Sequence, residues 1–186
     1  MTRLFDFIFS FLGLLILSPI LIVLITIGFF DSGLPIFRQE RVGKDKHHFR
    51  LMKFRSMHVN TQSVATHLAS ATSITRFGRF LRKSKLDELP QLWNVLIGDM
   101  SFVGPRPNLF NQEELFHERD ARGVYNVRPG ITGLAQINKI DMSTPKLLAE
   151  TDAIMIQDFN TFTYFKYIFL TVFGKGFGDR IRVQND

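Results

Sequence analysis

The chain has no cysteine among its 186 residues, and it has only one tryptophan. The absence of cysteine excludes disulfide bonds, thiolate catalysis and cysteine-ligated metal sites, and it is compatible with a reducing compartment. The five histidines show no metal-ligand spacing. His47 and His48 are adjacent, which favours exposed loop residues over a pair of ligands on one face. Internal repeats, low-complexity tracts and signs of a second domain are also absent from the sequence.

What the chain does contain is phenylalanine and positive charge, with 20 phenylalanines and a net charge of +6. Aromatic side chains favour cores and membrane interfaces. A basic balance implies an anionic partner or surface, and nucleic acid, acidic lipid and a phosphorylated substrate all satisfy it. The spacings typical of nucleic-acid-binding motifs are absent, and nucleic-acid binding would leave the apolar N-terminal segment unexplained. We therefore expect no nucleic-acid partner.

The N-terminal segment from Phe7 to Phe30 is 24 residues long and carries no charge. As one helix it would extend roughly 36 Å, enough to cross the ~30 Å hydrocarbon core of a bilayer. Hydropathy alone favours a single-pass anchor. No A-x-A-like cleavage site follows the segment, which argues against a signal peptide.

Ser18 and Pro19 lie near the middle of this segment and predict a bend, because proline removes a backbone donor and clashes with the preceding turn. The hydroxyl of Ser18 can bond a freed carbonyl, which makes a bend tolerable in lipid. Basic residues lie on both sides of the segment, Arg3 before it and Arg38 after it. This distribution favours both ends on the cytoplasmic side.

Local patterns predict the elements that follow. Residues 35–43 and 49–57 indicate a hairpin of two short extended segments, and residues 58–75 a polar loop near the site. Residues 109–122 and 144–155 look helical. Residues 158–173 are rich in aromatics, typical either of an interfacial helix or of a buried one.

A basic segment precedes the most informative stretch of the chain. Helical spacing places four basic residues along one side, with phenylalanines adjacent: Arg76, Arg79, Arg82 and Lys83. Either this is a solvated helix face, or it is an interfacial helix on anionic headgroups. The apolar N-terminal segment favours the second interpretation.

The stretch from Leu86 to Pro107 then places two adjacent acids, Asp87 and Glu88, ahead of an arginine between prolines. The pattern of Ser84 to Asp87 is also that of a capping box, which would give the acids a purely structural role. A carboxylate among cations should stay ionised, and carboxylates serve as nucleophiles at phosphorus.

Two proline-containing loops carry the other candidate phosphate ligands. Arg106 is restricted by a proline on each side and would be presented from a stiff loop, which suits bidentate contact with phosphate. The alternative is a surface turn with a solvated arginine. The segment Arg128–Gly133 is either an anion-binding nest of backbone amides or a tight turn.

The stretch from Leu86 to Pro107 resembles the core signature of the bacterial sugar transferases, the small monotopic phosphoglycosyl transferases. The similarity extends from the N-terminal segment to about Asp152. It implies that Asp87 attacks the β-phosphate of a UDP-sugar and expels UMP. A polyprenol (undecaprenyl) phosphate then takes the sugar phosphate from Asp87. It further implies a re-entrant membrane helix, kinked at Ser18–Pro19, on the cytoplasmic face of the bacterial inner membrane.

The resemblance also assigns supporting roles. Glu88 is the proton acceptor or the organiser of the site, and Mg²⁺ bridges Asp87 and the diphosphate. The phosphate and nucleotide contacts are Arg106, Arg128, Lys53 and Arg82. An N-acetylated amino sugar on UDP is the expected donor, and surface-glycan synthesis the expected pathway.

Two positions depart from the family pattern. Lys139 follows Asn138 where many relatives continue Gly-Arg, and Tyr164 replaces an acid found in a number of relatives. Neither touches the expected nucleophile, but both bear on sugar specificity and C-terminal docking. The chain is also expected to be the minimal form, without the additional N-terminal membrane helices of larger relatives.

We therefore expect a mostly helical α+β fold with one short β-hairpin and amphipathic interfacial helices. Residues 1–31 would form the re-entrant membrane helix, and residues 32–186 a single catalytic domain on the cytoplasmic face. The alternative function is a non-enzymatic membrane-surface protein that binds anionic lipid through its basic helix. It gives no reason for two acids beside a Pro-Arg-Pro segment.

Overall fold

The computed structural model describes residues 2–59 and 73–173, and in these the predicted α+β class is confirmed. Most of the predicted loop at 58–75 lies outside the described residues. The helices are α1 (Thr2–Ser32), α2 (Arg76–Ser84), α3 (Gln91–Ile97), α4 (Glu113–Ala121), α5 (Leu134–Ile137), α6 (Pro145–Gln157) and α7 (Thr161–Val172). The strands are β1 (Ile36–Val42), β2 (His48–Phe54), β3 (Ser101–Val103) and β4 (Gly130–Thr132), joined in part by the 3-10 turns η1 (Lys44–Lys46), η4 (Leu86–Glu88) and η5 (Val124–Asn126).

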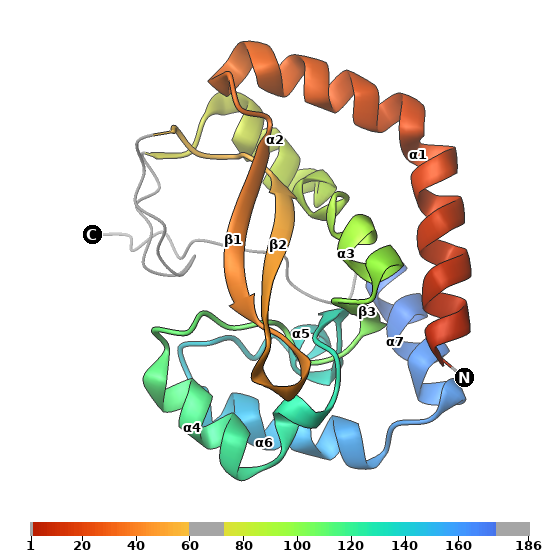
Figure 1. Cartoon of the computed structure of the whole chain (residues 1–186), viewed down its shortest axis with the longest axis vertical. Helices are drawn as coiled ribbons and strands as arrows, with labels where there is room; N and C mark the ends of the chain where they lie inside the picture. Colours follow the sequence, from red (N-terminus) through yellow and green to blue (C-terminus); the bar gives the residue numbers. More distant parts are fainter. Residues whose placement is uncertain (1, 60–72, 174–186) are drawn as a thin grey trace.

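Helix α1 runs along one side of the domain and changes direction about midway (Figure 1). Pro19 lies inside the helix, and the hydroxyl of Ser18 donates to the Leu15 carbonyl at 2.8 Å. By length and composition the helix could cross a membrane, and most of its apolar side chains are exposed. The helix is thus far less buried than a core helix, which is consistent with membrane association.

The first turns of α1 are held on the domain by two charged side chains. Arg3 donates to the carbonyls of Val95 and Leu96 at the end of α3. The buried Asp6 accepts from the hydroxyls of Tyr164, at 2.8 Å, and Ser101, at 3.0 Å, and from the Phe102 amide. Burial and the Asp6 carboxylate both raise the pKa of Tyr164, so that its hydroxyl remains a donor.

The last turns of α1 also pack on the same domain. Leu24 is 5% exposed and shares an apolar cluster with Phe54 of β2 and Leu81 of α2. Gly28 allows Pro35 to approach, since a Cβ there would lie 3.0 Å from the proline Cβ. Both ends of a 31-residue helix are therefore fixed to one folded unit.

The predicted hairpin is confirmed, with β1 antiparallel to β2 and a register from Ile36↔Phe54 to Val42↔His48. The second strand ends at Phe54, three residues earlier than predicted. Alternation along β2 turns Phe49 and Leu51 toward the core, where they pack on Val95 of α3. His48 is exposed and stacks on Phe110.

A buried asparagine fixes α3 against the hairpin. The Asn94 side chain accepts from the Met52 amide at 3.0 Å and donates to the Arg50 carbonyl at 2.9 Å. One side chain thus satisfies a donor and an acceptor on the outer edge of β2, where no further strand pairs among the residues that the structure describes. This contact places the turn η4, just ahead of α3, beside β2.

The second sheet is a parallel pair, β3 with β4, in the register Ser101↔Gly130 and Val103↔Thr132. Gly104 and Gly130 meet backbone to backbone, because a Cβ on Gly130 would lie 2.0 Å from the Gly104 nitrogen. The Arg128–Gly133 segment was predicted as a nest or a tight turn, and both predictions are wrong. It contains a strand, and its Gly130 amide donates to the Pro105 carbonyl.

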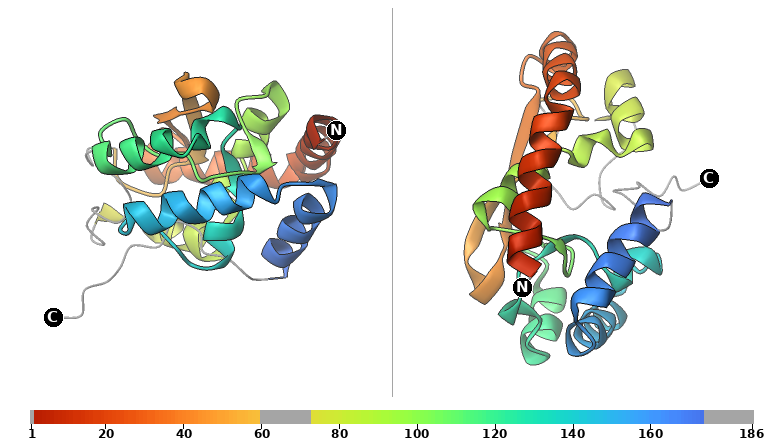
Figure 2. Two further views of the ribbon diagram at one scale, coloured as in Figure 1. Left: turned by 90° about the horizontal axis from the view of Figure 1, so that it is seen from below. Right: turned by 90° about the vertical axis from the view of Figure 1, so that its right-hand side faces the viewer.

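Helices α4 and α6 lie side by side beneath the sheets (Figure 2). The helix predicted at 109–122 is shorter than expected and begins at Glu113, because the Gln112 side chain binds the Leu109 amide and forms a turn before it. The helices predicted at 144–155 and 158–173 are confirmed as α6 and α7 with small shifts.

Candidate active site

Asp87 and Glu88 lie in the turn η4, between the end of α2 and the start of α3. Lys85 turns the chain there in the left-handed region, at φ 59°. The capping-box interpretation of this segment is wrong, because Ser84 donates back to the Phe80 carbonyl at 2.8 Å and so closes the preceding helix. Asp87 is 5% exposed, so the pair of acids is turned into the protein rather than toward solvent.

Glu88 forms an ion pair with Arg106, at 3.1 Å between Oε1 and Nη2. Both side chains are largely buried, which contradicts the alternative of a solvated arginine on a surface turn. The pair joins two segments that are 18 residues apart in the sequence. The acids and the Pro-Arg-Pro segment therefore belong to one constellation.

Lys53 of β2 lies in the same constellation. It lines a small cavity together with Arg106, Gln91 at the start of α3, and Gly130 of β4. Lys53 is only 8% exposed. Two cationic side chains, Lys53 and Arg106, thus line one small cavity, an arrangement that suits a phosphate group.

Four basic residues lie along one side of α2 and are called here the basic stripe: Arg76, Arg79, Arg82 and Lys83. Of these, the side chain of Arg82 points into the protein. Its Nε donates to the Ser56 hydroxyl at 2.7 Å, just beyond the end of β2. Its Nη1 is buried and has no hydrogen-bond partner among the described residues. The other three basic residues of the stripe are exposed: Arg76, Arg79 and Lys83.

Arg128 is not brought to this constellation. Its Nε donates to the Gly98 carbonyl at 2.9 Å, at the far end of α3 from the acids. It lines a separate cavity of about 320 Å³ with Asp6, Ser101 and Met155. Ser101 and Val103 of β3 line that cavity, whereas Phe102 between them points to the other face of the β3–β4 pair. Ile131 of β4 lies on this other face, where it lines the small cavity that also contains Lys53.

Within the described ranges, 2–59 and 73–173, no group of three or more histidine, aspartate and glutamate side chains is arranged to hold a metal. Asp87 and Glu88 supply at most two carboxylates, and Glu88 already accepts from Arg106. This donor set fits Mg²⁺, which commonly takes one or two protein carboxylates and completes its shell with substrate phosphate and water.

Sequence patterns missed a second buried ion pair beneath Arg106. Arg119 of α4 and Asp152 of α6 are 1% and 0% exposed, and they meet at 2.6 Å. Burial raises the pKa of Asp152, while Arg119 acts in the opposite direction. Burial also raises the pKa of the nearby Tyr125 hydroxyl. Arg119 sits in a short charged helix that looks solvated in the sequence, so no local signal identified it.

The model of the bacterial sugar transferase family matches residues 1–176. The chain belongs to this family. A UDP-glucose:undecaprenyl-phosphate glucose-1-phosphate transferase from Klebsiella pneumoniae is 42% identical over 185 residues, covering 94% of this chain and 40% of that protein. An undecaprenyl-phosphate galactose phosphotransferase from Salmonella typhimurium is 39% identical over 162 residues, covering 76% and 34% respectively.

A third relative is similar over most of its own length. The sugar transferase EpsL of Bacillus subtilis is 39% identical over 171 residues, covering 91% of this chain and 84% of that protein. The chain spans about two fifths or less of the glucose and galactose transferases. Their names give hexoses rather than an N-acetylated amino sugar, so the comparisons do not support the amino sugar expected from the sequence.

Proposed function

We propose that this chain transfers a hexose-1-phosphate from a UDP-hexose to a polyprenol phosphate at a bacterial membrane, releasing UMP and starting a surface glycan. The observation that carries the proposal is the Glu88–Arg106 ion pair, which joins the acidic turn η4 to the Pro-Arg-Pro segment next to the buried Lys53. A lipid-binding protein without activity would have no use for this buried arrangement.

In the first step a carboxylate oxygen of Asp87 attacks the β-phosphorus of the UDP-hexose. The bond between that phosphorus and the bridging oxygen breaks, and UMP leaves with the electron pair. The product on the enzyme is an acyl phosphate of Asp87 that carries the hexose. In the second step an oxygen of the polyprenol phosphate attacks the same phosphorus, and Asp87 leaves as a free carboxylate.

The fixed cations supply the electrostatic part of catalysis. Arg106 and Lys53 lie together and would hold the diphosphate while negative charge develops on the leaving UMP. Arg82 would offer its buried Nη1 to the same anion. We place Arg128 outside the first contact with phosphate, because its guanidinium is fixed on Gly98.

Two features of the site constrain the mechanism. Asp87 is 5% exposed, whereas an attacking atom must come within about 3–3.5 Å of phosphorus, so substrate must displace the side chains that cover it. Glu88 already accepts from Arg106, which favours the role of site organiser over that of proton acceptor. Mg²⁺ held by Asp87 and substrate oxygens would neutralise charge on the diphosphate.

The direct test follows UMP release from purified protein in detergent with Mg²⁺, polyprenol phosphate and a panel of UDP-sugars. We expect UDP-glucose or UDP-galactose to give at least about tenfold higher kcat/KM than UDP-N-acetylglucosamine, since a site that bonds a hydroxyl discriminates against a bulkier amide. A higher value for the amino sugar would overturn the hexose assignment. UMP release from none of the donors would overturn the proposed activity.

We further infer that α1 enters and leaves the membrane on one face. Its first turns bind α3, β3 and α7, and its last turns pack on α2 and β2, so both ends contact the same domain. A helix spanning ~30 Å of hydrocarbon would separate its ends to opposite sides. Exposed apolar residues on three helices would extend this membrane-facing surface: Phe80 of α2, Trp93 and Ile97 of α3, and Phe165 and Phe169 of α7.

Because the chain has no cysteine, single cysteines can report this topology directly. We expect Thr2→Cys, Asp31→Cys and the domain reporter Ser143→Cys to react with a membrane-impermeant maleimide from the same side of sealed vesicles. Protection of Thr2→Cys or Asp31→Cys until the vesicles are opened, with Ser143→Cys labelled, would show that α1 spans the bilayer.

A further inference from the structure

The Pro-Arg-Pro segment is fixed through its backbone along its whole length. Five consecutive carbonyls, from Pro105 to Leu109, each accept a hydrogen bond from another part of the domain or from the segment's own end. The donors, in order, are the Gly130 amide, Arg119 Nη1, Arg41 Nη1, the Val42 amide, and finally Asn108 Nδ2 with the Gln112 amide. The segment is thus anchored to β1, to β4 and to α4 before any substrate binds.

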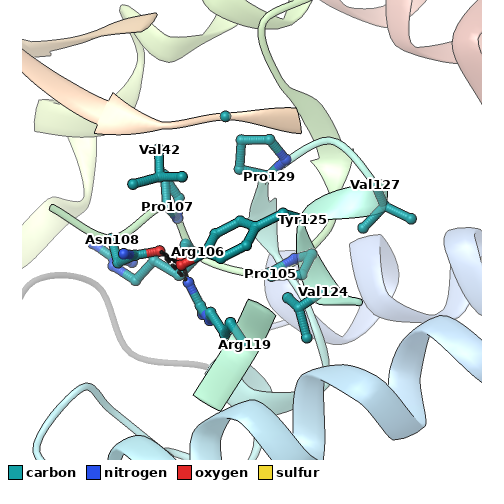
Figure 3. Close-up of a pocket in the computed structure, with 11 residues that line it drawn as sticks. Val42, Pro105, Arg106, Pro107, Asn108, Arg119, Val124, Tyr125, Val127 and Pro129 are labelled. Carbon is teal, nitrogen blue, oxygen red and sulfur yellow. Dashed lines mark hydrogen bonds between the residues drawn. The ribbon is translucent and has the colours of Figure 1, made fainter. Parts of the chain in front are cut away.

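Arg119 makes the contact nearest to the chemistry. Its Nη1 donates to the Arg106 carbonyl at 2.8 Å and to Asn108 Oδ1 at 2.9 Å, while its Nε and Nη2 both donate to one oxygen of Asp152. Tyr125 donates to the same Asn108 oxygen at 3.1 Å. In Figure 3 the side chains of Asn108, Tyr125 and Arg119 converge at Arg106, with Arg119 reaching up from α4.

The directions of these hydrogen bonds explain why position 119 is an arginine. A planar guanidinium offers five donors in fixed directions, so one side chain can bind Asp152, the Arg106 carbonyl and Asn108 together. A lysine carries its three donors on one nitrogen, so it cannot reach the acceptors that Arg119 binds through three separate nitrogens. A buried ion pair is weak evidence for stability, since apolar residues of equal volume often serve as well or better. The network therefore indicates a directional role.

We propose that Arg119 is a positioning residue: clamped by Asp152, it fixes the backbone of Arg106 so that the Arg106 guanidinium is presented to Glu88 and to substrate phosphate. This inference rests on the proposed function of Arg106. It couples the α4–α6 layer to the Pro-Arg-Pro segment and, through Arg106, to Glu88 in the turn η4. Because its guanidinium donates to Asp152, Arg106 and Asn108, Arg119 would act through Arg106 and not on the substrate itself.

The test is a double-mutant cycle between Arg119→Lys and Arg106→Lys, read as kcat and KM for UMP release and as the melting temperature. We expect Arg119→Lys to lower kcat/KM about 10- to 100-fold, as a misplacement near 1 Å can do. Once Arg106 is already a lysine, the same change should cost no more than about threefold, because coupled residues are not additive. Arg122→Lys is the matched control, since Arg122 ends the same helix and pairs with Glu118 and Glu150 near the surface.

Each result has one meaning. Equal fold-losses from Arg119→Lys in both backgrounds would overturn the inference and leave Arg119 a purely structural residue. Full activity of Arg106→Lys and of Arg106→Met would instead contradict the proposed site itself. If Arg119→Lys lacks a cooperative melting transition, the cycle is run with Asp152→Asn, which keeps one acceptor oxygen for Arg119, removes the charge and replaces the other oxygen by an amide nitrogen. The same non-additivity is expected there, and its absence would again overturn the inference.

Discussion

Replacing Asp87 by asparagine should abolish UMP release, with turnover reduced by at least about 10³-fold, the loss typical of removing a nucleophile. Asparagine has nearly the volume of aspartate and retains a hydrogen-bond acceptor, so the buried turn η4 should still fold. Its amide oxygen, however, cannot form the acyl phosphate on which both half-reactions depend. The measurement is initial-rate UMP release with saturating UDP-hexose and polyprenol phosphate.

The matched control for this substitution is Asp120→Asn. It makes the same exchange at an exposed carboxylate that pairs with Lys46 at 2.9 Å, and activity should change less than about twofold, because exposed pairs contribute little. Turnover by Asp87→Asn within tenfold of the unsubstituted chain would exclude covalent catalysis at this residue. Loss of activity in both variants would point instead to a general effect of the exchange.

The covalent step predicts a second, independent result for the same pair of proteins. Without polyprenol phosphate, the unsubstituted chain should exchange labelled UMP into UDP-hexose, because the first half-reaction is reversible and needs no acceptor. Intact-mass analysis should then show a species heavier by one hexose phosphate. Neither signal is expected from Asp87→Asn. Exchange that requires the acceptor would indicate a sequential reaction in place of the double displacement.

Elements whose pattern is local were predictable from the sequence. The charge-free N-terminal run gave α1, and two short extended segments around a polar turn gave the β1–β2 hairpin. The parallel pair β3–β4 was not predictable, because each strand has three residues and shows no period. Its formation depends on Gly104 and Gly130, whose close approach is decided by long-range packing.

The candidate site shows the same division between local and long-range information. Motif similarity selected Glu88, Arg106 and Lys53, and the structure places these three close together. Arg128 matched a motif equally well, yet it lies before β4 and its Nε donates to the Gly98 carbonyl instead. Arg119 belongs to a short helix rich in charged residues, which resembles a solvated one. Its burial arises from the packing of α4 on α6, which no local pattern encodes.

The role of Glu88 can be decided by comparing it with its partner Arg106. We expect Arg106→Met to reduce kcat about 10²- to 10³-fold, since it removes a fixed charge aimed at the developing anion. Glu88→Gln should cost no more than about tenfold, because the amide oxygen can still accept from Arg106. If Glu88 instead accepts a proton during the reaction, Glu88→Gln would remove that proton transfer, and kcat would fall by about 10²- to 10⁴-fold. The measurement is kcat for both variants across the pH range in which the unsubstituted chain is stable.

A control for charge alone is available in the exposed pair of Glu40 with His48, where Glu40→Gln should leave kcat unchanged. If Glu88 orients Arg106, Glu88→Gln should keep the shape of the pH–rate profile and lose little further activity when combined with Arg106→Met. If Glu88 accepts a proton, the acidic limb of the profile should disappear in Glu88→Gln, and its loss should multiply with that of Arg106→Met. The second pattern would contradict the organiser role. If Glu88 acts only by orienting Arg106, its substitution should have little further effect in a variant that already lacks Arg106.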